Sequence, residues 1–155
     1  MSTRDRIIHE SFMKEAISEA ARAAALGDVP IGAVIVKDGE VIGRGYNRTE
    51  VDRDPTMHAE MIAIRDAAKH LGGSRLTGCS LYVTVEPCAM CAGACVLARL
   101  DAVYAGTDSP KSGAAGSVKD ILTSKELNHT LVYETGILKE ECAVILKTFF
   151  TSLRT

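Results

Sequence analysis

Two short motifs constrain the fold of this chain more than any other feature: His58-Ala59-Glu60 and Pro87-Cys88-Ala89-Met90-Cys91. One imidazole and two thiolates are ligands that zinc accepts in proteins. Three such ligands leave the fourth tetrahedral position to water, which is typical of a catalytic zinc site and not of a closed structural one. The fold must therefore bring these two stretches together and form a pocket beside them.

Both motifs are predicted to lie at the beginning of a helix. Cys88 and Cys91 are three residues apart, so they share one face of the first turn, where the helix dipole favours thiolates. His58 and Glu60 are only two apart, but side chains in a first turn tilt toward the N-terminus and can converge there. We infer that two helix N-termini point at one metal. Glu60 then lies where it can take a proton from a zinc-activated water, whose pKa falls to about 7, and give it to a substrate nitrogen.

The Cys-x-x-Cys spacing by itself also fits a thioredoxin-like redox site or half of a structural zinc site. A redox site leaves His58-Ala59-Glu60 without a role. A structural zinc needs a fourth ligand, and Cys95 is the only candidate nearby in sequence. A buried apolar cysteine is the commoner state for such a residue, so we expect Cys95, like Cys79 and Cys142, to pack in the core.

Hydrophobic spacing predicts helices over residues 5–26, 57–71, 88–99 and 138–150, with one helical turn at 118–122. Short apolar runs predict strands over 31–37, 40–46, 80–86, 101–106 and 130–134, the first two joined by the hairpin signal Asp38-Gly39. Strands that alternate with helices indicate an α/β sandwich with a mixed sheet. A chain of 155 residues without a visible linker or repeat is expected to form one domain, residues 1–155.

Several smaller features of the chain carry expectations that a structure can test. Gly32, Gly43 and Gly45 lie inside predicted strands, where glycine marks a bulge or the close approach of another group. Asn47 follows the second strand and reads most simply as a turn residue that tolerates positive φ. Three histidines outside the motif have no partner at metal-binding spacing and are expected at the surface: His9, His70 and His129.

Composition limits the class of protein and its partners. The net charge is −2 and the isoelectric point about 6.1, so nucleic-acid binding would depend on a local patch. The first ten residues lack the apolar segment of a signal peptide, and no apolar run approaches the roughly 18 residues of a membrane span. We therefore expect a cytoplasmic protein with reduced thiols and no membrane partner. Basic side chains flank the predicted site, although scattered charges are usually just solvated: Arg44, Arg48, Arg53, Lys111, Lys119 and Lys125.

The two motifs together resemble the zinc-dependent nucleoside and base deaminase superfamily, in which a His-x-Glu and a Pro-Cys-x-x-Cys form the active centre. Further stretches resemble its bacterial tRNA adenosine deaminase branch, and together they span nearly the whole chain: residues 29–34, 45–48, 54–60, 86–94, 111–117 and 149–154. The resemblance implies a cytidine-deaminase-like fold of three α/β/α layers around a mixed five-stranded sheet. It also implies a homodimer.

The same resemblance implies hydrolytic deamination of adenosine to inosine at the wobble position of a tRNA anticodon stem-loop. One Zn²⁺ per subunit would be held by His58, Cys88 and Cys91, and Glu60 would move the proton. Asn47 would bind the flipped-out base, with backbone amides near Ala59 and Cys88 beside the leaving group. The remaining implied RNA contacts are Asp108, near the ribose, and the C-terminal residues Phe149, Phe150 and Arg154.

Two other functions remain open from the sequence. A deaminase of a free base or nucleoside, such as guanine or cytosine, would have the same metal ligands and differ only in the pocket and the C-terminal residues. A non-catalytic RNA-binding module stabilised by zinc would not need Glu60. Inosine formation in a stem-loop, turnover of a free base, and the effect of Glu60→Ala distinguish the three.

Overall fold

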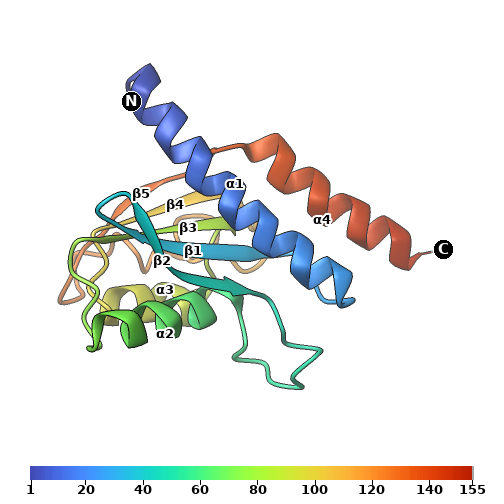
Figure 1. Ribbon diagram of the computed structural model, residues 1–155, viewed down its shortest axis with the longest axis horizontal. Coiled ribbons are helices and arrows are strands. Elements are labelled where there is room, and N and C mark those ends of the chain that lie inside the picture. Colours follow the sequence, from blue (N-terminus) through green and yellow to red (C-terminus); the bar gives the residue numbers. More distant parts are fainter. Residues whose placement is uncertain (155) are drawn as a thin grey trace.

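The computed structural model describes residues 1–154 and has a five-stranded sheet at its centre, in the order β2-β1-β3-β4-β5 (Figure 1). β1 pairs antiparallel with β2 and with β3, whereas β3, β4 and β5 run parallel. The sheet is therefore mixed, as predicted. The strand bounds are β1 Gly32–Lys37, β2 Glu40–Tyr46, β3 Cys79–Val85, β4 Ala102–Thr107 and β5 Val132–Glu134.

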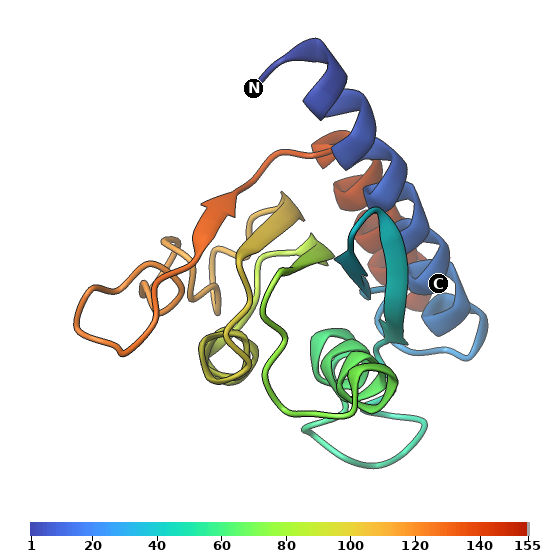
Figure 2. The same ribbon diagram turned by 60° about the vertical axis from the view of Figure 1, so that its left-hand side comes forward.

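Helices cover both faces of this sheet. The described part of the chain contains α1 Thr3–Ala25, α2 Ala59–Leu71, α3 Ala89–Leu97 and α4 Lys139–Leu153. α1 and α4 lie side by side on one face, and α2 and α3 lie on the other, as both ribbon views show (Figures 1 and 2). The three-layer α/β/α architecture is thus confirmed. None of the helices in the described residues has the length and apolar character needed to cross a membrane.

Local signals in the sequence account for the ends of α1. The Ser2 side chain accepts a hydrogen bond from the backbone N of Asp5 at 3.1 Å, which is the N-cap arrangement expected there. Gly27 follows the helix with a φ of 81°, a conformation that glycine adopts without steric cost. The chain then turns back so that residues 28–31 lead into β1, which lies between β2 and β3.

α2 packs unusually close to β2 because β2 carries glycine where the helix crosses it. A methyl group added at Gly45 would lie 2.7 Å from the backbone N of Ala63, and closer still to the carbonyl oxygen of Ala59. Gly43 faces the next turn of the same helix, near Ala63 and Ala67. The expected close approach is therefore made by the α2 backbone, and it determines where the first turn of α2 lies.

The structure corrects two predictions about the second half of the chain and the histidines. Residues 118–122 form no helical turn, and Ala115 and Asp120 instead form an isolated antiparallel bridge. The reason is that the backbone N–H groups of Ala115 and Ser117 donate hydrogen bonds to the Glu86 side chain, which holds this loop in place. His9 is not a free surface residue, since its ring stacks on Tyr104 with the centroids 4.1 Å apart.

The remaining differences in the fold are small. The Nε2 atom of His129 lies 2.7 Å from the backbone oxygen of Leu100, so this ring has a partner. His70 is exposed, as predicted. β2 has the predicted ends, and the other helix and strand ends differ from the prediction by at most three residues. α4, for example, begins after Leu138, which adopts a φ of 53°. Cys79, Cys95 and Cys142 are buried in the two apolar clusters on either side of the sheet, as expected.

Candidate metal centre and active site

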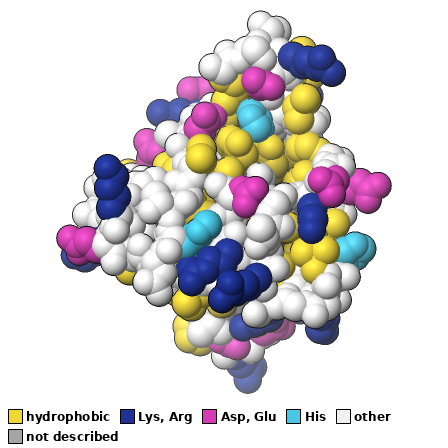
Figure 3. Space-filling model, turned by 90° about the vertical axis from the view of Figure 1, so that its left-hand side faces the viewer, with side chains coloured by type: hydrophobic (Ala, Val, Ile, Leu, Met, Phe, Trp, Pro, Cys, Tyr) yellow, Lys and Arg dark blue, Asp and Glu magenta, His cyan; other side chains and the backbone are white. Residues whose placement is uncertain are grey.

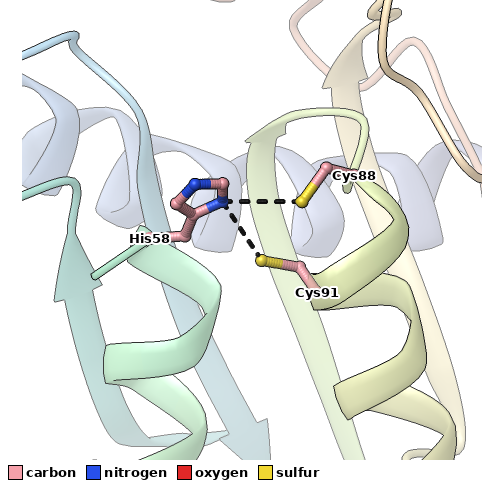
Figure 4. Close-up of side chains that lie close together, drawn as sticks. All are labelled: His58, Cys88 and Cys91. Atoms are coloured by element: carbon pink, nitrogen blue, oxygen red, sulfur yellow. Dashed lines mark hydrogen bonds between the residues drawn. The ribbon is translucent and has the colours of Figure 1, made fainter. Parts of the chain in front are cut away.

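His58, Cys88 and Cys91 meet where two helices begin. His58 is the N-cap of α2, Cys88 is the N-cap of α3, and Cys91 lies in the first turn of α3. Neither cap side chain makes the usual hydrogen bond to its own helix. The His58 Nδ1 atom instead lies 3.5 Å from the sulfur of Cys88 and 3.5 Å from the sulfur of Cys91 (Figure 4).

These separations fit a tetrahedral zinc site. With Zn–S distances of about 2.3 Å and Zn–N distances of about 2.0–2.1 Å, two ligands of one tetrahedral ion lie about 3.6 Å apart. The ligand atoms of all three side chains lie within 4.8 Å of one another. Cys95 is fully buried one turn further along α3 and does not belong to this group, so among residues 1–154 the group consists of three ligands.

The local electrostatics favour a thiolate in this cluster. Hydrogen bonds from Cys91 and then from His58 hold the pKa of the Cys88 thiol well below its usual range. The hydrogen bond with Cys88 raises the pKa of His58 in return. Burial raises the pKa of Cys95, which keeps that thiol neutral. The negative charge of the cluster therefore lies on the Cys88 sulfur.

Glu60 lies beside the cluster in the first turn of α2, and it is not one of the grouped ligands. Its side chain is buried, with 4% of its surface exposed. Burial raises the pKa of this carboxyl to about 7. A buried carboxylate at this place is unusual for a helix surface, where Glu is normally solvated.

A cavity of about 190 Å³ opens beside the metal ligands. This is smaller than the roughly 300–1,000 Å³ of a pocket for a drug-sized molecule, so it has room for one base and not for a nucleotide. Its lining combines the ends of β1, β2 and β3 with the first turns of α2 and α3. The lining residues are Val29, Ile31, Asn47, Thr49, His58, Ala59, Glu60, Val85, Glu86, Cys88, Ser109 and Ser112.

Asn47 and Ala59, two of the predicted substrate-binding residues, lie in this lining. Asn47 is buried and keeps a negative φ, so the simple turn interpretation of this residue is wrong. Its Nδ2 donates to the Asp28 carboxylate at 3.3 Å and to the Val29 backbone oxygen at 3.2 Å. Its Oδ1 accepts from the backbone N of Thr49 at 3.4 Å.

The other predicted substrate residues do not line the cavity. Asp108 is exposed and accepts a hydrogen bond from Thr135 at 3.2 Å, next to the cavity residue Ser109. Phe149 and Phe150 form an edge-to-face pair on α4, with the ring centroids 5.5 Å apart. Arg154 is exposed at the C-terminal end of the same helix. Any contact they make with a substrate is therefore outside the base-sized cavity.

Sequence reasoning missed two buried carboxylates that flank the cavity. Asp28 accepts hydrogen bonds from the loop after β2, and Glu86 accepts them from the backbone of Ser109, Ala115 and Ser117. Those hydrogen bonds lower the pKa of Glu86 although its burial opposes them. Glu86 directly precedes the Pro-Cys-x-x-Cys motif, which was a usable signal, whereas Asp28 looks like an ordinary turn residue after Gly27.

Comparison with known proteins agrees with this arrangement. Residues 7–154 match the family of MafB19-like deaminases. A Bacillus subtilis (strain 168) protein named tRNA-specific adenosine deaminase is 48% identical over 94% of this chain and 90% of its own length. A Haemophilus influenzae protein of the same name is 44% identical over 94% of this chain and 84% of its own length.

Solved structures give the same result for the fold. A structure from studies of A-to-I editing by tRNA:A34 deaminases superposes with a TM-score of 0.84 and 44% identity, over 88% of this chain and 99% of that one. A guanine deaminase from Bacillus subtilis is 46% identical, with a TM-score of 0.62 over 64% of each chain. By the extent of these matches, this chain belongs to the MafB19-like deaminase family, among relatives that are tRNA-specific adenosine deaminases.

Proposed function

We propose that this protein hydrolytically deaminates adenosine to inosine at the wobble position of a tRNA anticodon. The observation that carries the proposal is the buried Glu60 beside the His58, Cys88 and Cys91 cluster, at the wall of a cavity that holds one base. The Bacillus subtilis and Haemophilus influenzae relatives, named tRNA-specific adenosine deaminase, support the choice of substrate.

One zinc ion per subunit is proposed to bind His58, Cys88 and Cys91, whose spacing suits it. When bound, the metal supplies Lewis-acid activation of water for attack on C6 of adenine. Glu60 accepts the first proton of that water and delivers it to the purine ring, and it then carries the second water proton to the amino group, which departs as ammonia. Because Glu60 is 4% exposed, this transfer is shielded from bulk solvent.

The cavity walls orient the base for this reaction. Val29 and Ile31 offer an apolar surface to its ring, and Asn47 offers a polar contact in the same lining. The first backbone N–H groups of α2, beginning at Ala59, have no partner within the helix and lie beside the leaving group. Each of these roles belongs to the proposal.

The size of the cavity also supports an RNA loop as the substrate. A base reaches a cavity of about 190 Å³ only after it leaves its stack, which costs least in a single-stranded loop. Asp108, Phe149, Phe150 and Arg154 are proposed to contact nucleotides on either side of the flipped base. Figure 3 shows one face on which Lys and Arg side chains lie among Asp and Glu side chains, so electrostatic attraction of RNA is expected to be local.

We also propose that the protein acts as a homodimer in the cytoplasm and that residues 1–155 form a single catalytic domain. These points rest on the resemblance to the tRNA deaminase branch. Sedimentation of the zinc-loaded protein, alone and with a stem-loop, tests the dimer; a monomer in both conditions would contradict it.

The first test is to incubate the zinc-loaded protein with an anticodon stem-loop that carries adenosine at the wobble position, and with a matched stem-loop that carries guanosine there. We expect inosine only in the first RNA. The Glu60→Ala variant is expected to retain zinc and RNA binding but to form no inosine. Inosine formation by that variant would contradict the proposed role of Glu60, and absence of inosine with the native protein would contradict the function.

A second candidate function is zinc-dependent deamination of a free base or nucleoside, such as guanine or cytosine. The 46% identity to a Bacillus subtilis guanine deaminase over 64% of the chain favours it. Ammonia release from free guanine, cytosine or adenosine, without RNA, tests it. Turnover of a free base without inosine formation in the stem-loop would replace the first function by the second. RNA binding unaffected by Glu60→Ala, with no ammonia from any substrate, would indicate the non-catalytic module.

A further inference from the structure

We infer that Asp28 is a positioning residue: its buried carboxylate fixes the side chain of Asn47 and the loop 49–51, and so determines which polar group Asn47 presents to the substrate. The part of this inference that concerns the substrate rests on the proposed function. The part that concerns the loop does not, and the two are tested separately below.

The Asp28 side chain joins two segments that are far apart in the sequence. Its Oδ1 accepts from the backbone N of Val29 at 3.2 Å, from Asn47 Nδ2 at 3.3 Å and from the hydroxyl of Thr49 at 3.4 Å. Its Oδ2 accepts from the backbone N of Glu50 and of Val51, both at 3.0 Å. Val29, Asn47 and Thr49 all line the cavity, so one carboxylate connects three of its wall residues.

No cation contributes to this arrangement. Asp28 is 0% exposed, and the ion pairs found among residues 1–154 do not include it. A buried carboxylate is tolerated only where hydrogen bonds replace its hydration. The five donors do so, and two of them are backbone N–H groups of a loop that forms no helix or strand. The conformation of that loop therefore depends on the position and strength of the acceptor atoms of Asp28.

The same contacts determine the orientation of the Asn47 amide. An amide NH₂ has two hydrogens, and both are used by acceptors that cannot donate: the Asp28 carboxylate and the Val29 backbone oxygen. Turning the amide over would place oxygen against oxygen at both contacts. Any further polar contact that Asn47 makes in the cavity is therefore through Oδ1, as an acceptor. The substrate group that it recognises is then a donor, and in adenosine this is a ribose hydroxyl, because the one N–H donor of adenine is the amino group that leaves.

Asp28→Asn reverses this preference. The new amide oxygen is expected to stay with the two backbone N–H groups, so that its NH₂ faces the NH₂ of Asn47 and drives that amide to turn over. For the stem-loop, we expect KM to rise roughly 10- to 100-fold, as for loss of a hydrogen bond to a charged group, while kcat changes less. Zinc content is expected to stay at the native value.

A compensating variant separates positioning from general damage. Asn47→Asp alone places two carboxylates side by side and is expected to raise KM at least as much. In the double variant with Asp28→Asn, the new amide donates to the new carboxylate, which presents only acceptors to the cavity. We expect the double variant to have a lower KM than either single variant. Additive effects of the two substitutions would overturn the inference.

A matched control removes a charge without touching the cavity. Asp66 is an exposed carboxylate that accepts from one backbone N–H group, that of Arg44, at 3.0 Å. Asp66→Asn is expected to leave KM, kcat and zinc content at native values. If it raises KM as much as Asp28→Asn does, the effect is one of net charge, and the positioning role is refuted.

Amide hydrogen exchange tests the loop without any substrate. In the zinc-loaded Asp28→Asn protein, the new amide oxygen keeps the two hydrogen bonds from the backbone N–H groups of Glu50 and Val51 but is a weaker acceptor than a carboxylate. Exchange at Glu50 and Val51 is therefore expected to rise about tenfold, with the core strand β3 unchanged. Unchanged exchange at both amides would overturn the inference even if the native protein deaminates RNA. Faster exchange in a protein that deaminates no RNA would leave the loop role standing and refute only the proposed function.

If Asp28→Asn does not fold, Asp28→Glu takes its place in the kinetic and exchange measurements. It keeps the charge but displaces both acceptor atoms by one methylene. A raised KM with native zinc content is again expected, and a native KM would overturn the inference.

Discussion

Substituting Gly45 by Ala is expected to disturb the metal centre because the added methyl group displaces the first turns of α2. Gly45 has no positive φ, so the cost of the methyl group is steric. The group would lie 2.7 Å from the backbone N of Ala63 and nearer to the Ala59 oxygen, and real Cβ contacts stay beyond 3.0 Å. Neither neighbour is a flexible side-chain end, so the helix itself must move away from β2.

The size of the effect follows from this contact. Inserting a methylene into a packed core costs typically 1–3 kcal/mol. About 2 kcal/mol corresponds to a fall in Tm of about 4–8 °C for a chain of this length. The displaced turn is the one that His58 caps, and its ring must stay 3.5 Å from both sulfurs. We therefore expect weaker zinc retention in addition to lower stability.

Thermal unfolding with and without zinc, followed by competition with a chromophoric chelator, measures both effects. Gly73→Ala is the matched control, since no atom lies within 4 Å of its added methyl group and its φ is not positive. We expect the control to have a native Tm and native zinc affinity. If Gly45→Ala matches the control in both measurements, the close packing of α2 on β2 does not position the metal ligand.

Further variants address the ligands and the carboxylates. Cys91→Ser is expected to lower the bound zinc, measured by metal analysis, well below one ion per subunit. Cys95→Ala, which lies outside the ligand group, is expected to retain its zinc. Equal loss of zinc in both variants would contradict the three-ligand site. Glu60→Gln keeps the volume of the side chain but cannot take up a proton. The kcat on the stem-loop is therefore expected to fall at least about 100-fold with zinc retained. A native rate would exclude Glu60 as the proton carrier. Glu86→Gln weakens the acceptor for the backbone N–H groups of Ser109, Ala115 and Ser117. We therefore expect faster amide exchange in the loop 109–117 and a loss of about 1–3 kcal/mol in the free energy of unfolding. Unchanged exchange in this loop would refute the role of Glu86 in holding it.

Most of the fold was predictable because its signals are local. Hydrophobic spacing located the four helices, and β-branched runs located the five strands. The prediction at residues 118–122 was wrong for a physical reason. The Ala114 backbone oxygen accepts from Ile121, and Glu86 binds the preceding backbone, so distant contacts override a weak local preference for helix.

The candidate site was only half visible in the sequence. His58, Glu60, Cys88 and Cys91 stand out because few other arrangements explain those residue types at helix starts. Asp28 and Thr49 do not stand out, since an Asp after Gly27 and a Thr in a loop are common turn residues. Their role appears only when the turn after α1 and the loop after β2 lie against each other.

The sequence by itself determined the chemistry of this protein: which side chains can bind a metal, which carboxyl can carry a proton, and that they lie at the beginnings of two helices. These follow from residue type and short-range spacing, which are properties of the chain. Only the tertiary structure decided the size of the cavity, the orientation of Asn47 and the burial of Asp28. Those depend on contacts between segments brought together by the sheet, and such contacts leave no periodic pattern along the chain.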